Sequence, residues 1–182
     1  MRQIRVVAWV VGVMAVMVAN AAMAQGPPPT PKAGPEQQRL HYFVGNWKSE
    51  GEMKASPFGP AGKFTSTDET HMLGDFYLVT NSKGTGPMGA MTEVAIIGYD
   101  AKQKAYTYDN YSTMGLHEVS TGNPSGKIWT WTSNEEYGGK KMMGKFVLTE
   151  VSATSYTYKY DMSTDNGKTW EHIMDGKATK VK

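Results

Sequence analysis

The stretch that decides the fold is Trp47-Lys48-Ser49-Glu50-Gly51-Glu52-Met53-Lys54. Every second residue from Lys48 to Lys54 is charged, and the residues between them are uncharged. Because side chains alternate between the two faces of a β-strand, this pattern predicts a strand with one face in solvent and the other toward an interior. After residue 45, no stretch keeps the apolar period of a helix for three turns. The sequence therefore predicts an all-β domain.

The same alternation recurs through about ten segments that are separated by turn residues such as those of Ser56–Gly62. The segments expected to be strands are residues 46–54, 63–71, 75–83, 91–99, 104–112, 115–121, 127–134, 141–150, 154–162 and 168–181. Short connections favour an antiparallel up-and-down order, and closure into a barrel hides both sheet edges. We predict a ten-stranded antiparallel β-barrel preceded by a short helical turn at Arg39–Val44, with a β-sandwich as the alternative.

The first 24 residues have the features of a secretory signal peptide. Arg2 and Arg5 are followed by an apolar run of 13 residues, Val6–Val18, and then by Ala22-Met23-Ala24, a small-x-small cleavage site. The run is shorter than the roughly 20 residues that a membrane-spanning helix needs. We expect cleavage between Ala24 and Gln25 and a secreted or periplasmic product without a stable membrane anchor; an uncleaved anchor is the alternative.

The mature chain is expected to have two parts. Residues 25–38 contain five prolines, which favour extended backbone, so this segment is predicted to be a disordered tether to a barrel domain of residues 39–182. Loss of Arg2 and Arg5 lowers the lysine and arginine count from 19 to 17, which equals the 17 aspartates and glutamates. A neutral chain without clustered basic residues is not expected to bind nucleic acid.

The sequence contains no signature of a catalytic or metal site. There is no cysteine, which excludes disulfides, thiolate metal sites and a cysteine nucleophile. The four histidines (His41, His71, His117 and His172) have no ligand spacing, and Gly-x-Ser-x-Gly is absent. Met88-x-x-Met91 and Met142-Met143 could supply thioethers to copper(I), although methionine is more often an adaptable apolar filler. We therefore predict a protein that is not an enzyme, with no metal.

Large side chains with polar tips gather on the faces predicted to be interior. Tyr156, Tyr158 and Tyr160 alternate with Thr157, Lys159 and Asp161, for example. A buried tyrosine or tryptophan needs a hydrogen-bond partner, at a cost of roughly 1–3 kcal/mol if it has none. A cavity that holds water or a ligand explains these residues; aromatic rings that simply fill the barrel are the alternative. The residues expected to contact a ligand are Tyr106, Tyr108, Trp129, Trp131, Tyr156, Tyr158, Tyr160, Met162, His172 and Met174.

The segment Ser163-Thr164-Asp165-Asn166-Gly167-Lys168-Thr169-Trp170 resembles the Asp-box hairpin that recurs in sialidase-type propellers. In that motif the aspartate and glycine shape a turn and the tryptophan packs beneath it. A single copy cannot build a propeller, in which the motif repeats from blade to blade. We therefore interpret it as a structural hairpin.

The segment Phe43-Val44-Gly45-Asn46-Trp47 resembles the G-x-W start of the first strand in lipocalins and their calycin relatives. The resemblance implies that Gly45 and Trp47 close one end of the barrel, with Trp47 beneath a basic residue of the last strand, either Lys180 or Lys177.

A closer resemblance covers about residues 36–182. The residues that carry it are this start, Ile97-Gly98-Tyr99-Asp100 with Tyr106, the Ser163–Trp170 segment and a last strand that ends in lysine. Together they resemble an uncharacterised family of exported bacterial proteins, the lipocalin-like domain of unknown function fifteen-seventy-nine. The resemblance implies a calycin barrel in the bacterial cell envelope and no established activity.

These observations predict an exported protein that holds a small lipophilic or amphipathic molecule in a barrel cavity, without a cofactor and without catalysis. A second hypothesis, by analogy with ten-stranded nitrobindin barrels, is a haem protein with His172 as the axial ligand. A third is an envelope interaction module without a ligand, which would have a solidly packed interior and a functional surface on loops such as Ser82–Gly89.

Overall fold

A computed structural model describes residues 31–56, 59–137 and 139–181. The predicted signal peptide and residues 25–30 of the predicted tether lie outside the described residues. Every described helix and strand belongs to one compact unit, Ala33–Lys182. None of the described helices is long and apolar enough to cross a membrane.

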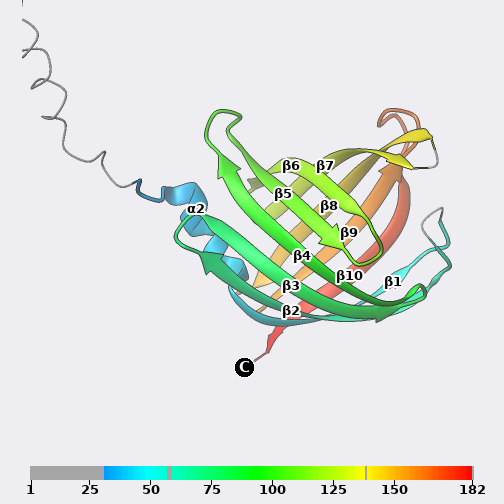
Figure 1. The fold of residues 1–182 in the computed structure, drawn as a ribbon, viewed down its shortest axis with the longest axis horizontal. Helices are drawn as coiled ribbons and strands as arrows, with labels where there is room; N and C mark the ends of the chain where they lie inside the picture. Colours follow the sequence, from blue (N-terminus) through cyan, green and yellow to red (C-terminus); the bar gives the residue numbers. More distant parts are fainter. Residues whose placement is uncertain (1–30, 57–58, 138, 182) are drawn as a thin grey trace, which may run out of the picture. The chain divides into compact units, whose positions relative to one another are not determined.

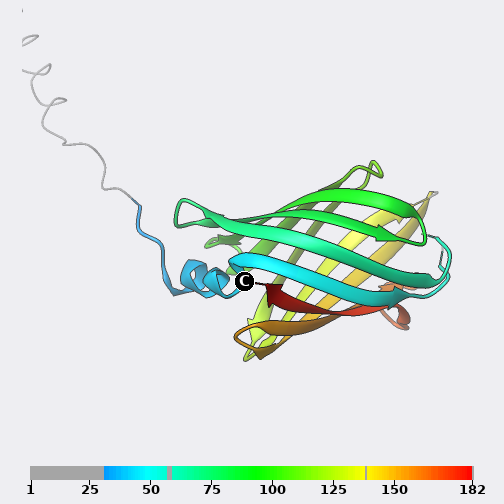
Figure 2. The ribbon, with the colours of Figure 1, turned by 90° about the horizontal axis from the view of Figure 1, so that it is seen from below.

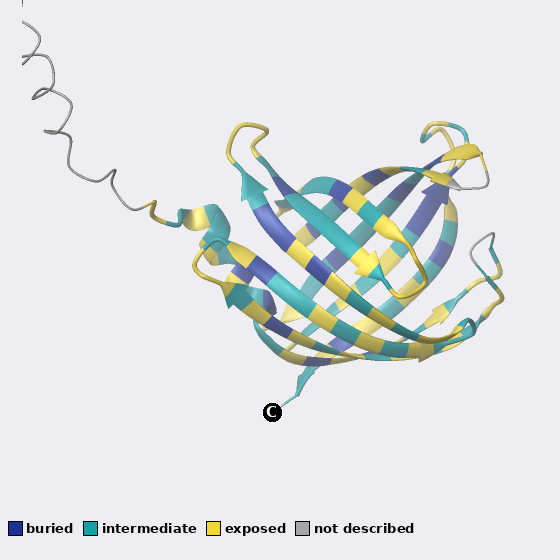
Figure 3. Cartoon of the chain, in the orientation of Figure 1, coloured by how far each residue is buried: buried dark blue, intermediate teal, exposed yellow. Residues whose placement is uncertain are grey.

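Ten antiparallel strands close into one barrel, which confirms the predicted fold class (Figure 1). Each strand pairs with the next along the chain, and β1 pairs with β10 to complete the closure. The elements are α2 (Pro35–Arg39), η1 (Leu40–Phe43), β1 (Gly45–Met53), β2 (Gly62–Leu73), β3 (Tyr77–Gly86), β4 (Gly89–Asp100), β5 (Ala105–Ser112), β6 (His117–Ser125), β7 (Ile128–Tyr137), β8 (Lys140–Ser152), β9 (Ser155–Ser163) and β10 (Glu171–Val181). Buried and exposed residues alternate along them (Figure 3), as the two-residue period predicts.

Some predicted strand boundaries were wrong. In one case a turn occupies residues that were expected in a strand, and in another the strand pairing continues past the predicted end. Residues 168–170 were expected in the last strand, but they belong to the Asp-box turn, where the backbone amide of Thr169 donates to Asp165 Oδ1 at 2.9 Å. In the opposite sense, residues 84–86 were expected to follow the strand predicted at residues 75–83, but they lie in β3, which pairs with β4 as far as Gly86 and Gly89.

The predicted tether was also too long, because residues 35–38 are helical. Pro35 begins α2, and proline is favoured at the first helical position, where its missing amide hydrogen would have no partner. The backbone amide of Gln38 donates to the Gly34 carbonyl at 3.1 Å, and the Gly34 amide donates to the Gln37 side chain at 2.9 Å. The helical turn that follows, η1, lies within the range that the sequence predicted.

The two helical elements lie at one end of the barrel (Figure 2) and close it. Leu40 is fully buried and Phe43 nearly so, and both pack in a core cluster with Leu78, Ile97 and Trp129. The Tyr106 hydroxyl donates to the carbonyl of Glu36 in α2 at 2.9 Å. The main core of the protein therefore lies at this closed end.

Trp47 is part of the closure. Its indole nitrogen donates to the Phe43 carbonyl at 2.7 Å, and its ring lies 4.9 Å from that of Tyr156. Lys180 Nζ lies 4.9 Å from the centre of the Trp47 ring, which is the arrangement that the lipocalin resemblance implied for Lys180. Gly45 has a φ of +125°, and a Cβ there would lie 3.1 Å from Lys180 Cε. Glycine thus permits the turn that brings Trp47 under Lys180.

Tyr42 connects η1 to the turn between β8 and β9, because its hydroxyl lies 2.8 Å from the Ser152 carbonyl and 2.9 Å from the Ser155 carbonyl. Tyr42→Phe removes this donor, and we expect the free energy of unfolding to fall by about 1 kcal/mol in urea titrations. Tyr111→Phe is the matched control, because Tyr111 is half exposed on the outer wall. Equal losses in the two variants would contradict a stabilising role for the Tyr42 contact.

Candidate ligand-binding cavity

A cavity of about 410 Å³ occupies the barrel interior. It extends from Phe43 and Trp47 at the closed end to Met53, Phe64 and Met91 at the other, and side chains from all ten strands line it. Small-molecule sites typically measure roughly 300–1,000 Å³. The interior is therefore hollow. The interaction-module hypothesis required a solidly packed interior, and the structure does not have one.

Six of the ten residues expected to contact a ligand line this cavity. They come from β5, β7, β9 and β10, and they are Tyr108, Trp131, Tyr156, Tyr158, Tyr160 and Met174. Burial raises the pKa of Tyr158 to about 12 and raises the pKa values of Tyr108, Tyr156 and Tyr160 as well. These tyrosines remain neutral at physiological pH, so their hydroxyls can donate hydrogen bonds.

Three of the other four residues point inward but do not line the cavity. Tyr106 and Trp129 belong to the closed-end core, where Trp129 Nε1 donates to Glu150 Oε1 at 2.6 Å and the Arg39 guanidinium lies 5.1 Å from its ring. Met162 is buried against Met142 and Ile173 in a second cluster. Strand alternation gives the face of a residue but not its depth in the barrel, and the structure places these three residues in the packed clusters instead of the cavity wall.

His172 faces outward, contrary to the prediction. Its register partner is Asp161, and the pairing with β9 shifts between His172 and Met174. Ile173 and Met174 both line the cavity, so this β-bulge moves His172 to the opposite face. Its ring nitrogens lie 3.0 Å from carboxylate oxygens of Asp175 and Asp161, and these contacts raise the pKa of His172. The haem hypothesis therefore lacks the inward axial ligand on which it was based.

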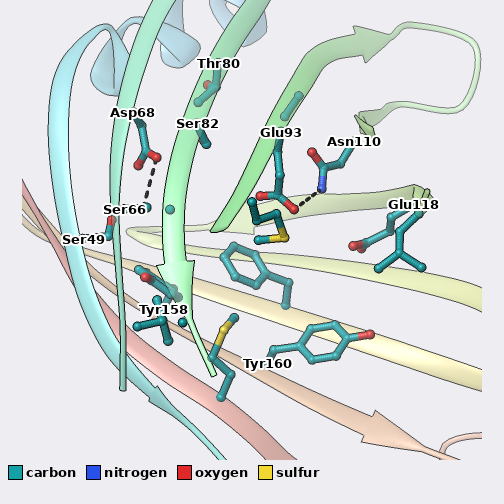
Figure 4. A pocket seen from close by; sticks show the side chains of 18 of the residues that line it. Ser49, Ser66, Asp68, Thr80, Ser82, Glu93, Asn110, Glu118, Tyr158 and Tyr160 are labelled. Atoms are coloured by element: carbon teal, nitrogen blue, oxygen red, sulfur yellow. Dashed lines mark hydrogen bonds between the residues drawn. The ribbon is translucent and has the colours of Figure 1, made fainter. Parts of the chain in front are cut away.

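Four carboxylates that were not predicted from the sequence line the cavity: Asp68 of β2, Glu93 of β4, Glu118 of β6 and Glu135 of β7. Figure 4 shows the first three of them. The two-residue period of the strands could have identified these carboxylates as inward-facing. Glu135 lies four residues after Trp131 and therefore on the same face of the strand. Charged residues are rarely buried, however, and this general rule argues for the outer faces of the strands.

The carboxylates differ in their hydrogen bonds. Asp68 accepts from Ser66 Oγ at 3.2 Å, and Glu93 accepts from Asn110 Nδ2 at 3.3 Å. Glu135 accepts from the hydroxyls of Ser133 and Tyr160. Glu118 has neither a hydrogen bond nor an ion pair with any described residue.

Burial raises the pKa values of Asp68, Glu93 and Glu118 above the ordinary range of a carboxyl group. For Glu118 the pKa rises to about 7, first because of burial and then because Glu135 and Glu93 carry like charges nearby. Burial also raises the pKa values of Asp68 and Glu93, despite the hydrogen bonds that both accept. The cavity wall thus holds carboxyl groups whose charge is poorly compensated.

Three more polar atoms beside the cavity have no hydrogen-bond partner among the described residues: Asn110 Oδ1, Ser120 Oγ and Trp131 Nε1. Ser120 and Trp131 are each only 3% exposed. Such groups usually bind water or a ligand, because an unpaired buried polar atom costs roughly 1–3 kcal/mol. The arrangement combines aromatic and aliphatic surface with unpaired polar atoms, which suits an amphipathic molecule.

Comparison with known proteins gives a family and a fold. The model of the family described as "Protein of unknown function (DUF1579)" matches residues 32–180. No curated protein matches the chain significantly. The crystal structure of Rv2717c from M. tuberculosis is similar, with a TM-score of 0.62 and 12% identity, over 83% of this chain and 100% of that one. The S-type phycobiliprotein lyase CPES from Guillardia theta has a TM-score of 0.51 and 11% identity, over 81% of this chain and 93% of that one.

Proposed function

The chain belongs to the DUF1579 family of proteins of unknown function, and we propose that it is an exported protein that binds a small lipophilic or amphipathic molecule in its barrel without transforming it. The observation that carries the proposal is the cavity of about 410 Å³, with Tyr108, Trp131 and Tyr158 in its wall. Apolar surface supplies affinity in such sites, and a few polar groups fix orientation. Export rests on the signal-peptide features of residues 1–24.

A fluorescent lipophile tests this function directly. We expect N-phenyl-1-naphthylamine to gain fluorescence with the purified mature chain, and Tyr158→Ala to weaken its binding about tenfold, which corresponds to about 1.4 kcal/mol of lost ring contact. Tyr158 is suited to this test because its ring lies 5.7 Å from that of Phe146 within the cavity wall.

Tyr111→Ala is the control, because Tyr111 lies on the outer wall and is 51% exposed. Circular dichroism checks that both variants keep the barrel. Absence of binding across a broad lipophile panel, or an equal loss in both variants, would count against a ligand-binding interior. Extraction of the purified protein with organic solvent should also release a bound compound for mass spectrometry.

A further inference from the structure

We propose that the ligand is an organic cation, an amphipathic amine whose charged head lies against Glu118 and whose apolar body extends toward the closed end. This inference rests on the proposed function, since it names the class of molecule that the same cavity selects. It follows from the cavity's charges, its unpaired polar atoms and its aromatic surface.

The charge of the cavity has one sign. Four carboxylates line it, and no lysine, arginine or histidine is among the described residues that do so. Glu93, Glu118 and Glu135 lie on β4, β6 and β7 and interact closely enough for the charges of the other two to raise the pKa of Glu118. A buried charge is costly unless it is paired. The group missing from this wall is a positive charge.

The unpaired polar atoms beside Glu118 are a second, independent observation that points to a ligand. Ser120 lies two residues after Glu118 on the same face of β6, and its buried hydroxyl has no partner among the described residues. Across the ladder, Asn110 is the register partner of Glu118 (Figure 4), and its Oδ1 likewise accepts from no residue that the structure describes. A protonated amine has several N–H donors, which can reach the Glu118 carboxylate and the Asn110 oxygen together.

The surroundings favour an organic cation over a metal ion. The described residues contain no group of three histidine or acidic side chains close enough to hold a metal. The rings of Tyr108, Trp131 and Tyr160 line the cavity, and aromatic faces attract ammonium groups, by about 2 kcal/mol where water is excluded. An anionic lipophile would be repelled by the carboxylates, and a neutral one would leave Glu118 unpaired.

The cavity also provides separate places for the head and the body. Along β4, Glu93 is followed on the same face by Ala95 and Ile97, and Ile97 belongs to the closed-end core. Leu78 and Leu148 line the cavity from the same core. On β3, β4 and β8 the inner half of the cavity is therefore apolar, and Glu93 lies between it and the open end. Asp68, the register partner of Trp47, is the carboxylate beside the closed end.

Three molecules with one apolar chain and different heads test the inference: decylamine, decanol and decanoate. Each is used to displace N-phenyl-1-naphthylamine from the wild-type mature chain at about pH 8, above the pKa of Glu118 of about 7. We expect decylamine to bind about tenfold more tightly than decanol, and decanoate more weakly than either.

Two variants then test whether Glu118 is the source of the preference for decylamine over decanol. In Glu118→Gln the preference for decylamine over decanol is expected to fall below about threefold, while decanol binding changes less than about twofold. Glu136→Gln is the matched control. Glu136 lies on the exposed face of β7, and its substitution makes the same change in net charge as Glu118→Gln. It should retain the full preference.

The outcomes separate the two proposals. Equal binding of decanol and decylamine by the wild type would overturn the cation inference and leave the ligand-binding function standing. A full decylamine preference in Glu118→Gln would likewise overturn it, since Glu118 would not be the contact. If the fluorescent lipophile and all three competitors fail to bind, the proposed function itself fails.

Discussion

Trp47→Ala is expected to lower the free energy of unfolding by about 3–5 kcal/mol, the range for removal of a large buried aromatic side chain. Trp47 is only 1% exposed, and the substitution removes its hydrogen bond to the Phe43 carbonyl along with its ring contact with Tyr156. Because η1 rests on this residue, we also expect the closed end to loosen. Urea unfolding followed by circular dichroism measures the free energy, and proteolysis between residues 35 and 44 reports the loosening.

Lys180→Met is the control for the Trp47 variant. Its ammonium lies 4.9 Å from the Trp47 ring, so the loss is limited to one cation–π contact, about 0.5–1 kcal/mol at a partly exposed site. A loss below about 1 kcal/mol in Trp47→Ala would show that Trp47 does not hold the barrel end closed, contrary to the packing argument.

Glu118→Gln is expected to stabilise the empty protein by about 2–3 kcal/mol at pH 8 and to leave its stability nearly unchanged at pH 4. The ordinary pKa of this carboxyl is 4.5, and burial with the neighbouring charges raises it to about 7 in the folded state. Between these values the folded state retains a proton that the unfolded state has released. Stability therefore falls as the pH rises from about 4.5 to 7, at up to about 1.4 kcal/mol per pH unit. Glutamine, which carries no charge, removes this cost.

The groups that face Glu118 support a loss of stability as the pH rises. Glu93 on β4 and Glu135 on β7 carry like charges, and Tyr108 and Tyr160 remain neutral because their own pKa values are raised. Urea titrations of both proteins at pH 4 and pH 8 measure the effect, with Glu136→Gln as the control on the outer face. A Glu118→Gln variant less stable than the wild type at pH 8 would mean that this carboxylate is already paired in the empty protein.

The same residue is thus expected to destabilise the empty barrel and to anchor its ligand. If Glu118 binds a cation, saturating decylamine should recover the stability that burial of this carboxylate costs at pH 8, and it should do so in the wild type more than in Glu118→Gln. A residue that lowers stability in the absence of ligand is typical of a binding site rather than of a structural core.

Part of the cavity could be predicted from the sequence because strand alternation is a local property. Tyr156, Tyr158 and Tyr160 share a face with one another whatever the rest of the chain does, and that face is interior. The same alternation is consistent with inward positions for Glu93, Glu118 and Glu135, but the general exposure of charged residues argues against them at the level of sequence. Their grouping could not be read along the chain, since they lie on three different strands.

The sequence by itself determined the ten-stranded closed barrel, because the barrel follows from short-range periodicity and turn chemistry. The packing of Trp47 at the barrel end was implied by the resemblance of Gly45-Asn46-Trp47 to the start of a lipocalin, and the structure confirms it. Only the tertiary structure decided the depth of each inward residue. Trp129 and Trp131 both belong to the closed-end core, but only Trp131 reaches the cavity wall. The tertiary structure also decided the bulge that turns His172 outward and the gathering of carboxylates beside unpaired polar atoms. The physical reason is that depth and cross-strand neighbours depend on register and closure, which involve residues far apart in the chain.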